Sequence, residues 1–189
     1  MPVNRDLFPF RRGKYYIHAP ERGLSGERDL RERLDGLEPL GRESEGLSLL
    51  DLGCAEGHVV EYFLTAGVRL AHGFDNQRKR IAAARRLVVD RRARFEVGEL
   101  SDWPRFLRAP SLEPSYDIVL LFSVYQQLPE RTRAAALAGM AALCDRWFGL
   151  RLGQPALRAE ACRVLENEGL VTSPELSSRR VLVFRRTGR

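Results

Sequence analysis

From residue 47 onward the chain alternates between short apolar runs and stretches whose apolar residues recur at helical spacing. The apolar runs predict buried strands at 47–52, 69–74, 93–97, 116–122 and 147–152. The helically spaced stretches predict helices at 59–64, 77–90, 129–144 and 155–168. Two further β-rich runs follow, near 170–172 and at 180–184. Strands that alternate with helices predict an α/β fold with right-handed crossovers and a mostly parallel sheet, covered by helices on both faces.

The first 46 residues have a different character from the rest of the chain. They are polar and balanced in charge, with nine Arg or Lys and nine Asp or Glu, and they end in the Gly-, Glu- and Ser-rich stretch 41–46. We therefore predict two parts, an N-terminal segment 1–46 and a domain 47–189. Tyr15, Tyr16 and His18 cluster in the first part. We expect this segment to fold over the cleft of the domain as a lid or substrate-binding segment.

Composition narrows the class of protein. The 189 residues are 44% hydrophobic and include three cysteines without a C-x-x-C pair, so we expect a folded chain with neither a disulfide framework nor a metal site. No apolar run reaches the roughly 18 residues of a membrane span. The opening Met1-Pro-Val-Asn-Arg-Asp lacks the apolar core of a secretory signal. We therefore expect a cytoplasmic protein without membrane contact.

The first predicted strand runs into a glycine-containing turn, Asp51-Leu-Gly53-Cys-Ala-Glu56-Gly57. In parallel sheets the ligand lies beside such a turn, at the carboxyl ends of the strands. The spacing G-x-x-x-G differs from the G-x-G-x-x-G that holds a pyrophosphate. The carboxylates Asp51 and Glu56 would repel a pyrophosphate but suit a cation. S-adenosylmethionine carries an ammonium and a sulfonium, so the turn favours this cofactor over a dinucleotide.

Further candidate residues follow the next strands. Asp75, after the second strand, is placed to accept hydrogen bonds from ribose hydroxyls. Glu99, after the third strand, is placed to accept from an adenine amino group, and Leu100 to cover one face of the adenine. The loop 122–128 after the fourth strand would face the methyl group.

Together these motifs resemble the class I, Rossmann-like S-adenosylmethionine-dependent methyltransferases. The resemblance rests on LLDLGCAEG (49–57), GFD (73–75), VGEL (97–100) and YDIVLLFSVYQQL (116–128), and it covers roughly 47–186. It implies a doubly wound, mostly parallel seven-stranded sheet with an antiparallel C-terminal strand. It also implies cofactor contacts at Asp51, Gly53, Gly57, Asp75, Asn76, Glu99, Leu100 and Phe122.

The sequence departs from the family pattern at three places. Ala55 replaces the middle glycine of the first turn, Glu99 replaces a frequent Asp, and Gln126-Gln127 stand where many small-molecule members have a His. The loop also lacks the [N/D/S]-P-P-[Y/F/W] pattern of members that methylate exocyclic amines of nucleobases or glutamine.

The function expected is methyl transfer from S-adenosylmethionine, by in-line displacement, to a small-molecule or glycan-precursor acceptor. We predict His18 as a general base, because histidine as a residue type titrates near neutral pH, and Tyr125 as a hydrogen-bonding group for the nucleophile.

Two alternatives stay open. One is a tRNA or rRNA methyltransferase, because window 78–108 holds ten Arg or Lys against four Asp or Glu. The other is a non-catalytic subunit that only binds S-adenosylmethionine.

Overall fold

The computed structural model describes residues 15–188 and divides into two compact units at the Asp35–Gly36 bond. In the first unit, β1 (Tyr15–His18) pairs in parallel with β2 (Gly26–Asp29), and the short helix η2 (Pro20–Arg22) lies between them in the chain. α1 (Leu30–Leu34) follows directly. Its N-cap is Asp29, whose carboxylate accepts hydrogen bonds from the backbone N–H groups of Arg31 and Glu32.

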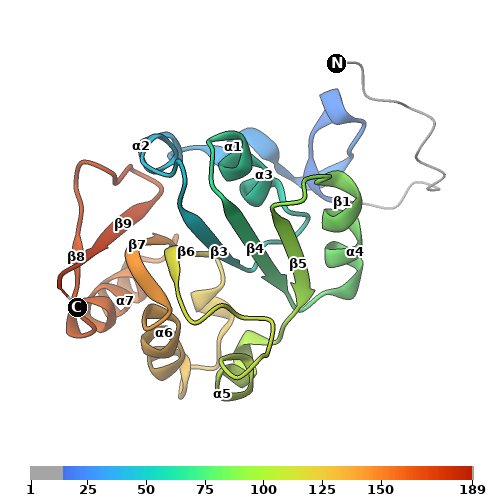
Figure 1. Ribbon diagram of the computed structural model, residues 1–189. Coiled ribbons are helices and arrows are strands. Elements are labelled where there is room, and N and C mark those ends of the chain that lie inside the picture. The colour runs from blue at the N-terminus through green and yellow to red at the C-terminus, as the bar shows by residue number, and fades with distance from the viewer. Residues whose placement is uncertain (1–14, 189) are drawn as a thin grey trace. The chain divides into compact units, whose positions relative to one another are not determined.

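The second unit is built on a seven-stranded sheet in the order β5-β4-β3-β6-β7-β9-β8 (Figure 1). The strands are β3 (Ser48–Leu52), β4 (Leu70–Asp75), β5 (Ala93–Val97), β6 (Tyr116–Phe122), β7 (Cys144–Arg151), β8 (Leu170–Thr172) and β9 (Leu182–Arg186). All pairs from β5 to β7 are parallel, and β9 is antiparallel to both β7 and β8. The predicted doubly wound sheet with an antiparallel C-terminal strand is confirmed.

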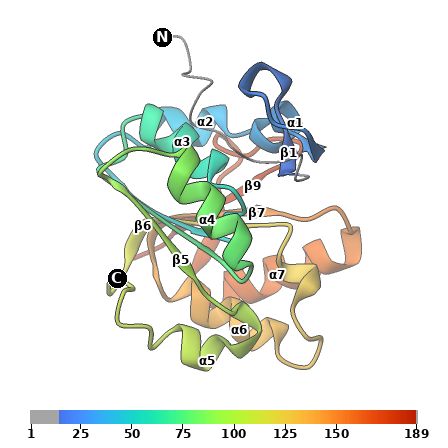
Figure 2. The ribbon, with the colours of Figure 1, turned by 90° about the vertical axis from the view of Figure 1, so that its right-hand side faces the viewer.

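Helices cover both faces of this sheet (Figure 2). On one side lie α3 (His58–Thr65) and α4 (Arg78–Leu87). On the other lie α5 (Trp103–Phe106), α6 (Arg133–Ala141) and α7 (Pro155–Asn167). The short helices α2 (Glu38–Arg42), η3 (Leu100–Asp102) and η4 (Tyr125–Gln127) lie in the connections. No helix in the described part of the chain is long and apolar enough to span a bilayer.

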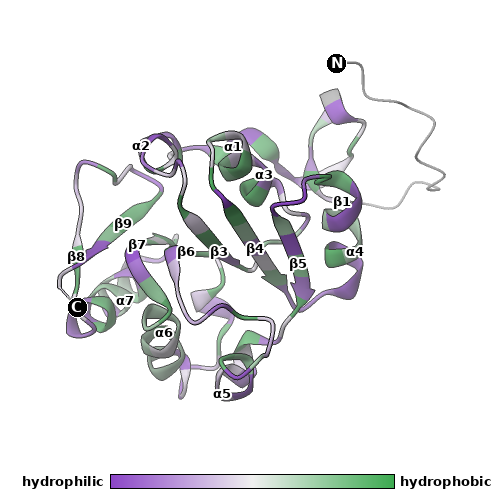
Figure 3. Cartoon of the chain, in the orientation of Figure 1, coloured by the Kyte–Doolittle hydropathy of each residue, from purple (hydrophilic) through white to green (hydrophobic). Residues whose placement is uncertain are grey.

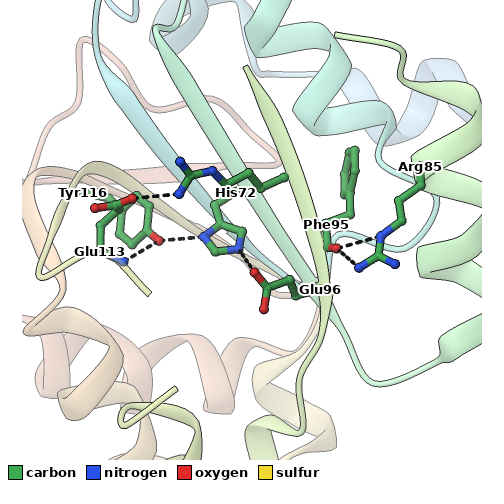
Figure 4. Close-up of polar contacts among 7 residues, drawn as sticks. His72, Arg85, Phe95, Glu96, Glu113 and Tyr116 are labelled. Carbon is green, nitrogen blue, oxygen red and sulfur yellow. Dashed lines mark hydrogen bonds and ion pairs between the residues drawn. The ribbon is translucent and has the colours of Figure 1, made fainter. Parts of the chain in front are cut away.

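The central strands are apolar because both of their faces are covered. Every residue of β3 is buried, and in β6 only Asp117 is partly exposed. In Figure 3, β4 is largely green, whereas purple segments alternate with green ones along the edge strand β5. The Arg85 guanidinium of α4 donates two hydrogen bonds to the Phe95 carbonyl of β5, at 3.0 and 2.6 Å (Figure 4). This interaction covers part of the strand edge.

The predicted elements differ from the structure mainly at their ends. The helix expected over 129–144 is shorter, because Pro129–Thr132 form turns and Cys144 already belongs to β7. Pairing with β6 begins at Cys144 opposite Tyr116, which extends β7 toward its amino end. The elements before residue 47 and the α5 region carry too little apolar periodicity to be recognised from the sequence.

Candidate functional site

The turn after β3 is fixed to the end of β4 by three backbone N–H groups. Gly53 and Cys54 donate to the Phe74 carbonyl at 2.8 and 2.9 Å, and Ala55 donates to the Asp75 carboxylate at 3.1 Å. The turn lies where the sheet order reverses, because β3 is flanked by β4 on one side and by β6 on the other. Ligands of open α/β sheets bind at such a switch point.

Three residues of this turn have left-handed backbone conformations. The φ angles are +86° at Gly53, +49° at Ala55 and +82° at Gly57. A Cβ atom at Gly53 would lie 2.3 Å from Cγ2 of Val124, in the loop after β6. Glycine is therefore required at Gly53 for both conformation and space. Ala55, the departure from the family pattern, adopts the left-handed conformation despite its side chain.

Carboxylates gather at this edge of the sheet. Asp51, Glu56 and Asp75 are at most 5% exposed. One Asp75 oxygen accepts from Ala55 N–H, the other accepts from Gln77 N–H at 2.9 Å, and the Arg80 guanidinium lies 3.6 Å away. A carboxylate has about four acceptor positions, so Asp75 keeps capacity for a ligand hydroxyl. Buried acids at a glycine turn make the site suited to a cation with hydroxyl groups.

The residues predicted around the adenine lie together at the ends of β4 and β5. The Asn76 side chain donates to the Glu99 carboxylate at 3.3 Å. Glu99 also accepts hydrogen bonds from the Ser101 hydroxyl at 2.8 Å and the Ser101 N–H at 3.1 Å. These bonds, led by the one from the Ser101 hydroxyl, hold the pKa of Glu99 below its usual value. Leu100 is buried beside this cluster as the first residue of η3.

The end of β6 forms the other side of the switch point. Phe122 is buried as the last residue of β6, and the next residue, Ser123, has a left-handed φ of +61°. The N–H of Ser123 donates to the carbonyl of Arg151, the last residue of β7, at 2.9 Å. The Arg151 guanidinium carbon lies 4.9 Å from the centre of the Phe122 ring. Arg151 is thus held beside the switch point through both its backbone and its side chain.

Tyr125 lies in the same loop but is directed into the protein. Its side chain is fully buried, and its hydroxyl donates to the Glu160 carboxylate of α7 at 2.6 Å. Arg133 of α6 donates to both oxygens of Glu160, at 2.8 and 2.6 Å. Burial, with the bond to Glu160, holds the pKa of Tyr125 above its ordinary value. The Tyr125 proton is therefore engaged by Glu160, and the predicted contact with a nucleophile stays a prediction.

The remaining predicted residue, His18, is the last residue of β1 in the first unit, and its role as general base also stays a prediction. The two compact units adjoin at the Asp35–Gly36 bond. The division into an N-terminal lid or substrate-binding segment 1–46 and a cofactor-binding domain 47–189 stays a prediction. Residues 1–14 of the first segment lie outside the described residues. Among the described residues, no group of His, Cys, Asp or Glu is arranged to hold a metal ion.

Sequence reasoning missed three residues at this edge, Ser123, Val124 and Arg151. Ser123 and Val124 stand in the motif after the fourth strand, but nothing in their identity indicates a left-handed turn or a close approach to Gly53. Arg151 ends an apolar run, and only the pairing of β7 with β6 places it opposite Phe122.

A family model described as "Methyltransferase domain" matches residues 49–146, about half of the chain. A search of curated proteins finds no match.

Similar solved structures are magnesium protoporphyrin IX methyltransferase of Synechocystis with bound S-adenosylmethionine and N-methyltransferase NodS of Bradyrhizobium japonicum with S-adenosylhomocysteine. The first has a TM-score of 0.65 and 22% identity over 84% of this chain and 78% of that one. The second has a TM-score of 0.66 and 16% identity over 84% and 87%. A putative RNA methyltransferase of Pyrococcus horikoshii has a TM-score of 0.62 and 16% identity over 84% of each chain.

The chain belongs to this family of methyltransferase domains. It is a class I, Rossmann-like S-adenosylmethionine-dependent methyltransferase, and S-adenosylmethionine is its cofactor.

Proposed function

We propose that the protein transfers the methyl group of S-adenosylmethionine to a small-molecule or glycan-precursor acceptor bound beside the end of β6. The cofactor would be held by the edge of the sheet from β6 to β5. Its proposed contacts are Asp51, Gly53, Gly57, Asp75, Asn76, Glu99, Leu100 and Phe122. The observation that carries this proposal is the left-handed turn at Gly53, which lies between buried carboxylates at the switch point of the sheet.

The residues fit the cofactor in shape and in charge. The backbone at Gly53 is bare, and a side chain there would collide with Val124. The ammonium and sulfonium of the cofactor match the acids Asp51 and Glu56, and its ribose hydroxyls match the remaining acceptor positions of Asp75. Glu99, held by Ser101 and Asn76, presents a carboxylate near the expected adenine amino group.

Catalysis would rest on positioning. S-adenosylmethionine supplies an electrophilic methyl group on a positively charged sulfur. The chain's part is to hold the acceptor atom in line with that bond and to exclude water. The loop after β6 is suited to this task, because Tyr125 anchors it to Glu160 and Ser123 is bonded to Arg151. For an acceptor that must lose a proton, we propose His18 as the base.

Titration calorimetry with S-adenosylmethionine and Asp51→Asn tests the proposed cofactor site. We expect the intact protein to bind S-adenosylmethionine. The variant removes a buried negative charge at nearly constant shape, so we expect it to bind the cofactor at least about tenfold more weakly. Glu166→Gln, an exposed acid on α7, is the matched control and should bind normally. Thermal melting shows whether each variant is folded. No binding by the intact protein would refute the proposed function, whereas normal binding by a folded Asp51→Asn would refute only the role of Asp51.

RNA is the second candidate acceptor, favoured by the exposed cations of α4 and the turn after it. Among the described residues, Arg78, Lys79 and Arg91 are exposed and form no ion pair. A pocket lined in part by Arg85, Arg91 and Arg94 lies where α4 ends and β5 begins. Such a positively charged surface is suited to bind along the phosphate backbone of RNA.

Binding to bulk tRNA at several salt concentrations tests this candidate. We expect the affinity for tRNA to fall as the salt concentration rises. In a variant with Arg78, Lys79 and Arg91 changed to Gln, the plot of log affinity against log salt concentration should be less steep, by roughly 0.7–0.9 in slope for each phosphate that is no longer neutralised. The control variant has the same change of charge at another place, with Arg131, Arg179 and Arg180 changed to Gln. An affinity independent of salt, or equal slopes in the two variants, would count against RNA.

A further inference from the structure

We propose that Glu160 of α7 is a positioning residue for methyl transfer. It acts through Tyr125 to hold the loop after β6, residues 123–128, against the turn after β3, residues 53–57. The inference rests on the proposed function, because it takes the methyl donor to lie at that turn. It gives a part in the reaction to a helix that supplies none of the proposed cofactor contacts.

The loop after β6 borders the turn at which the donor is proposed to bind. A Cβ atom at Gly53 would lie 2.3 Å from Cγ2 of Val124, so Val124 fills the space beside that glycine. β6 pairs in parallel with β3, and the loop therefore leaves the sheet at the same edge as the turn. The loop thus bounds the space beside the donor, where an acceptor atom must approach the methyl group in line.

Hydrogen bonds within the loop make it one compact unit. The Gln127 N–H donates to the Val124 carbonyl at 2.7 Å, and the Gln127 side chain donates to the Ser123 carbonyl, also at 2.7 Å. The Leu128 N–H donates to the Tyr125 carbonyl at 3.2 Å. A displacement of Tyr125 is therefore passed on to Val124, and whatever holds Tyr125 also sets the position of Val124.

Tyr125 is anchored by side chains from two helices. Its hydroxyl donates to Oε1 of Glu160 at 2.6 Å. Arg133, the first residue of α6, donates from Nε to Oε1 at 2.8 Å and from Nη2 to Oε2 at 2.6 Å. The guanidinium carbon of Arg133 also lies 5.7 Å from the centre of the Tyr125 ring. α6 and α7 lie side by side on one face of the sheet (Figure 1, Figure 2), so Glu160 joins the loop to both.

Glu160 holds this arrangement as a charged and shielded group. Hydrogen bonds, first from Arg133 and then from Tyr125, hold the pKa of Glu160 below its usual value, so the side chain is ionised at neutral pH. The side chains of Arg133 and Glu160 are only 15% and 28% exposed. Hydrogen bonds to an ionised acceptor are stronger than those between neutral groups, and a bidentate pair also fixes the orientation of the carboxylate.

A displaced loop should slow methyl transfer more than it weakens donor binding. The turn after β3 is fixed to β4 by bonds of its own, among them those from Gly53 and Cys54 to the Phe74 carbonyl. Transfer in addition needs the acceptor atom aligned with the methyl group, and a misplacement of about 1 Å can cost about a hundredfold in rate. Loss of the anchor should therefore lower kcat while the affinity for the donor stays near normal.

The test variants are Glu160→Gln and Tyr125→Phe, alone and combined. Glutamine keeps the shape of Glu160 but removes its charge and one of its acceptor oxygens, and phenylalanine removes only the hydroxyl of Tyr125. Glu166→Gln, at an exposed acid on the same helix, is the matched control. Arg186→Met is the control for loss of stability, because Arg186 donates to the carbonyl of Ala141, the last residue of α6.

Hydrogen exchange measured by NMR reports on the loop without an acceptor. The amides of Ser123, Gln127 and Leu128 are the probes in the loop, and those of Gly53 and Cys54 are the probes in the turn. We expect each test variant to raise the ratio of loop exchange to turn exchange at least about tenfold, because the loop opens locally when its anchor is lost. The ratio should be unchanged in both controls.

Transfer is followed with S-adenosylmethionine labelled in its methyl group. The acceptor preparations are a metabolite extract freed of macromolecules by ultrafiltration, and total RNA. In whichever preparation the wild type labels, we expect kcat to fall at least about tenfold in each test variant. The KM for S-adenosylmethionine, and the affinity for S-adenosylhomocysteine by calorimetry, should stay within about threefold of the wild type.

The double variant and the controls distinguish positioning from stability. Because Glu160 acts through Tyr125, the double variant should be at most about threefold slower than the slower single variant. Glu166→Gln and Arg186→Met should keep a kcat within about twofold of the wild type, at a temperature at which urea denaturation shows every protein to be folded.

Several outcomes would overturn the inference. These are an unchanged exchange ratio in the test variants, an unchanged kcat in either single variant, fold-losses that multiply in the double variant, and an equal loss of kcat in Arg186→Met. A loss of donor affinity as large as the loss of kcat would overturn it as well, as would a wild type that binds S-adenosylmethionine but labels neither preparation. Absence of S-adenosylmethionine binding by the wild type would instead be a failure of the proposed function.

Discussion

Two residues in the described part of the chain have left-handed backbone conformations without being glycine, Ala55 and Ser123. They follow β3 and β6, the two neighbouring strands on either side of the switch point. Such conformations cost free energy and cluster at binding sites, where the surrounding structure holds them. At the residue scale, backbone strain and buried acids thus mark the same edge of the sheet.

Ala55→Gly tests the strain in the turn. We expect the free energy of unfolding to rise by about 0.5–1 kcal/mol, because glycine adopts a positive φ without the steric penalty that alanine bears. Chemical denaturation measures the change. Ala82→Gly, at an exposed position within α4, is the control and should lower stability by about 1 kcal/mol. Destabilisation by Ala55→Gly as large as that by Ala82→Gly would contradict the argument.

His72 is a fully buried residue whose two ring nitrogens face polar groups (Figure 4). Nδ1 lies 2.8 Å from the Tyr116 hydroxyl, which in turn accepts the Glu113 N–H, and Nε2 lies 3.3 Å from Glu96. Burial lowers the pKa of His72, and the Glu96 carboxylate opposes that shift only in part. The folded protein therefore binds a proton at His72 less readily than the unfolded chain does.

Stability should consequently fall as the pH drops below about 6.5, the ordinary pKa of histidine. The unfolded state then takes up a proton that the folded state resists, with a slope of up to about 1.4 kcal/mol per pH unit for a single group. Denaturation between pH 8 and 5 measures this slope. His72→Phe should be less stable at pH 8 but lose part of the pH dependence, whereas Tyr116→Phe should keep it. An unchanged slope in His72→Phe would refute the assignment.

At the scale of elements, one side chain joins the ends of two helices to the sheet. Arg186, the last residue of β9, donates to the carbonyls of Ala141 at the end of α6, Glu168 just after α7, and Cys144 at the start of β7. The carbonyls at helix ends lack partners within the helix and carry partial negative charge. A guanidinium with five donors satisfies several of them at once.

Arg186→Met should lower the free energy of unfolding by about 2–3 kcal/mol, because carbonyls lose hydrogen bonds from a charged donor. Arg185→Met serves as the control, since Arg185 is the neighbouring exposed arginine of the same strand and should change stability by at most about 0.5 kcal/mol. Urea denaturation followed by circular dichroism compares the two variants. Equal effects would show that Arg186 has no special role in holding α6 and α7.

At the scale of the whole molecule, residues 36–46 at the start of the second unit pack against the elements of the sheet domain. A Cβ at Gly41 of α2 would lie 2.7 Å from the hydroxyl oxygen of Tyr62 in α3, and one at Gly36 would lie 2.2 Å from the Ser178 hydroxyl. The Gly46 N–H also donates to the Gly67 carbonyl at 2.9 Å. Residues 36–46 therefore pack on the second unit, although their composition resembles that of the residues before them.

Two fragments test this placement. Fragment 36–189 should unfold cooperatively, whereas fragment 47–189 should be less stable by about 3–6 kcal/mol, because it lacks the buried Leu37 and Leu40 together with the close packing at Gly41. Thermal and urea unfolding of both fragments beside the full chain measures the difference. Equal stability of the two fragments would favour the boundary predicted from composition, at residue 46.

The sequence alone determined the order of strands and helices from residue 47 onward, because burial on both faces requires continuous apolar strands. It also indicated S-adenosylmethionine, since acids at a glycine turn favour a cation whatever the surrounding packing. Tertiary structure decided which side chains from distant elements meet. The pairing of β6 with β7 sets Arg151 against Phe122, and the packing of α6 and α7 turns the Tyr125 hydroxyl toward Glu160. These interactions join residues about 30 apart in the chain, so no local pattern specifies them.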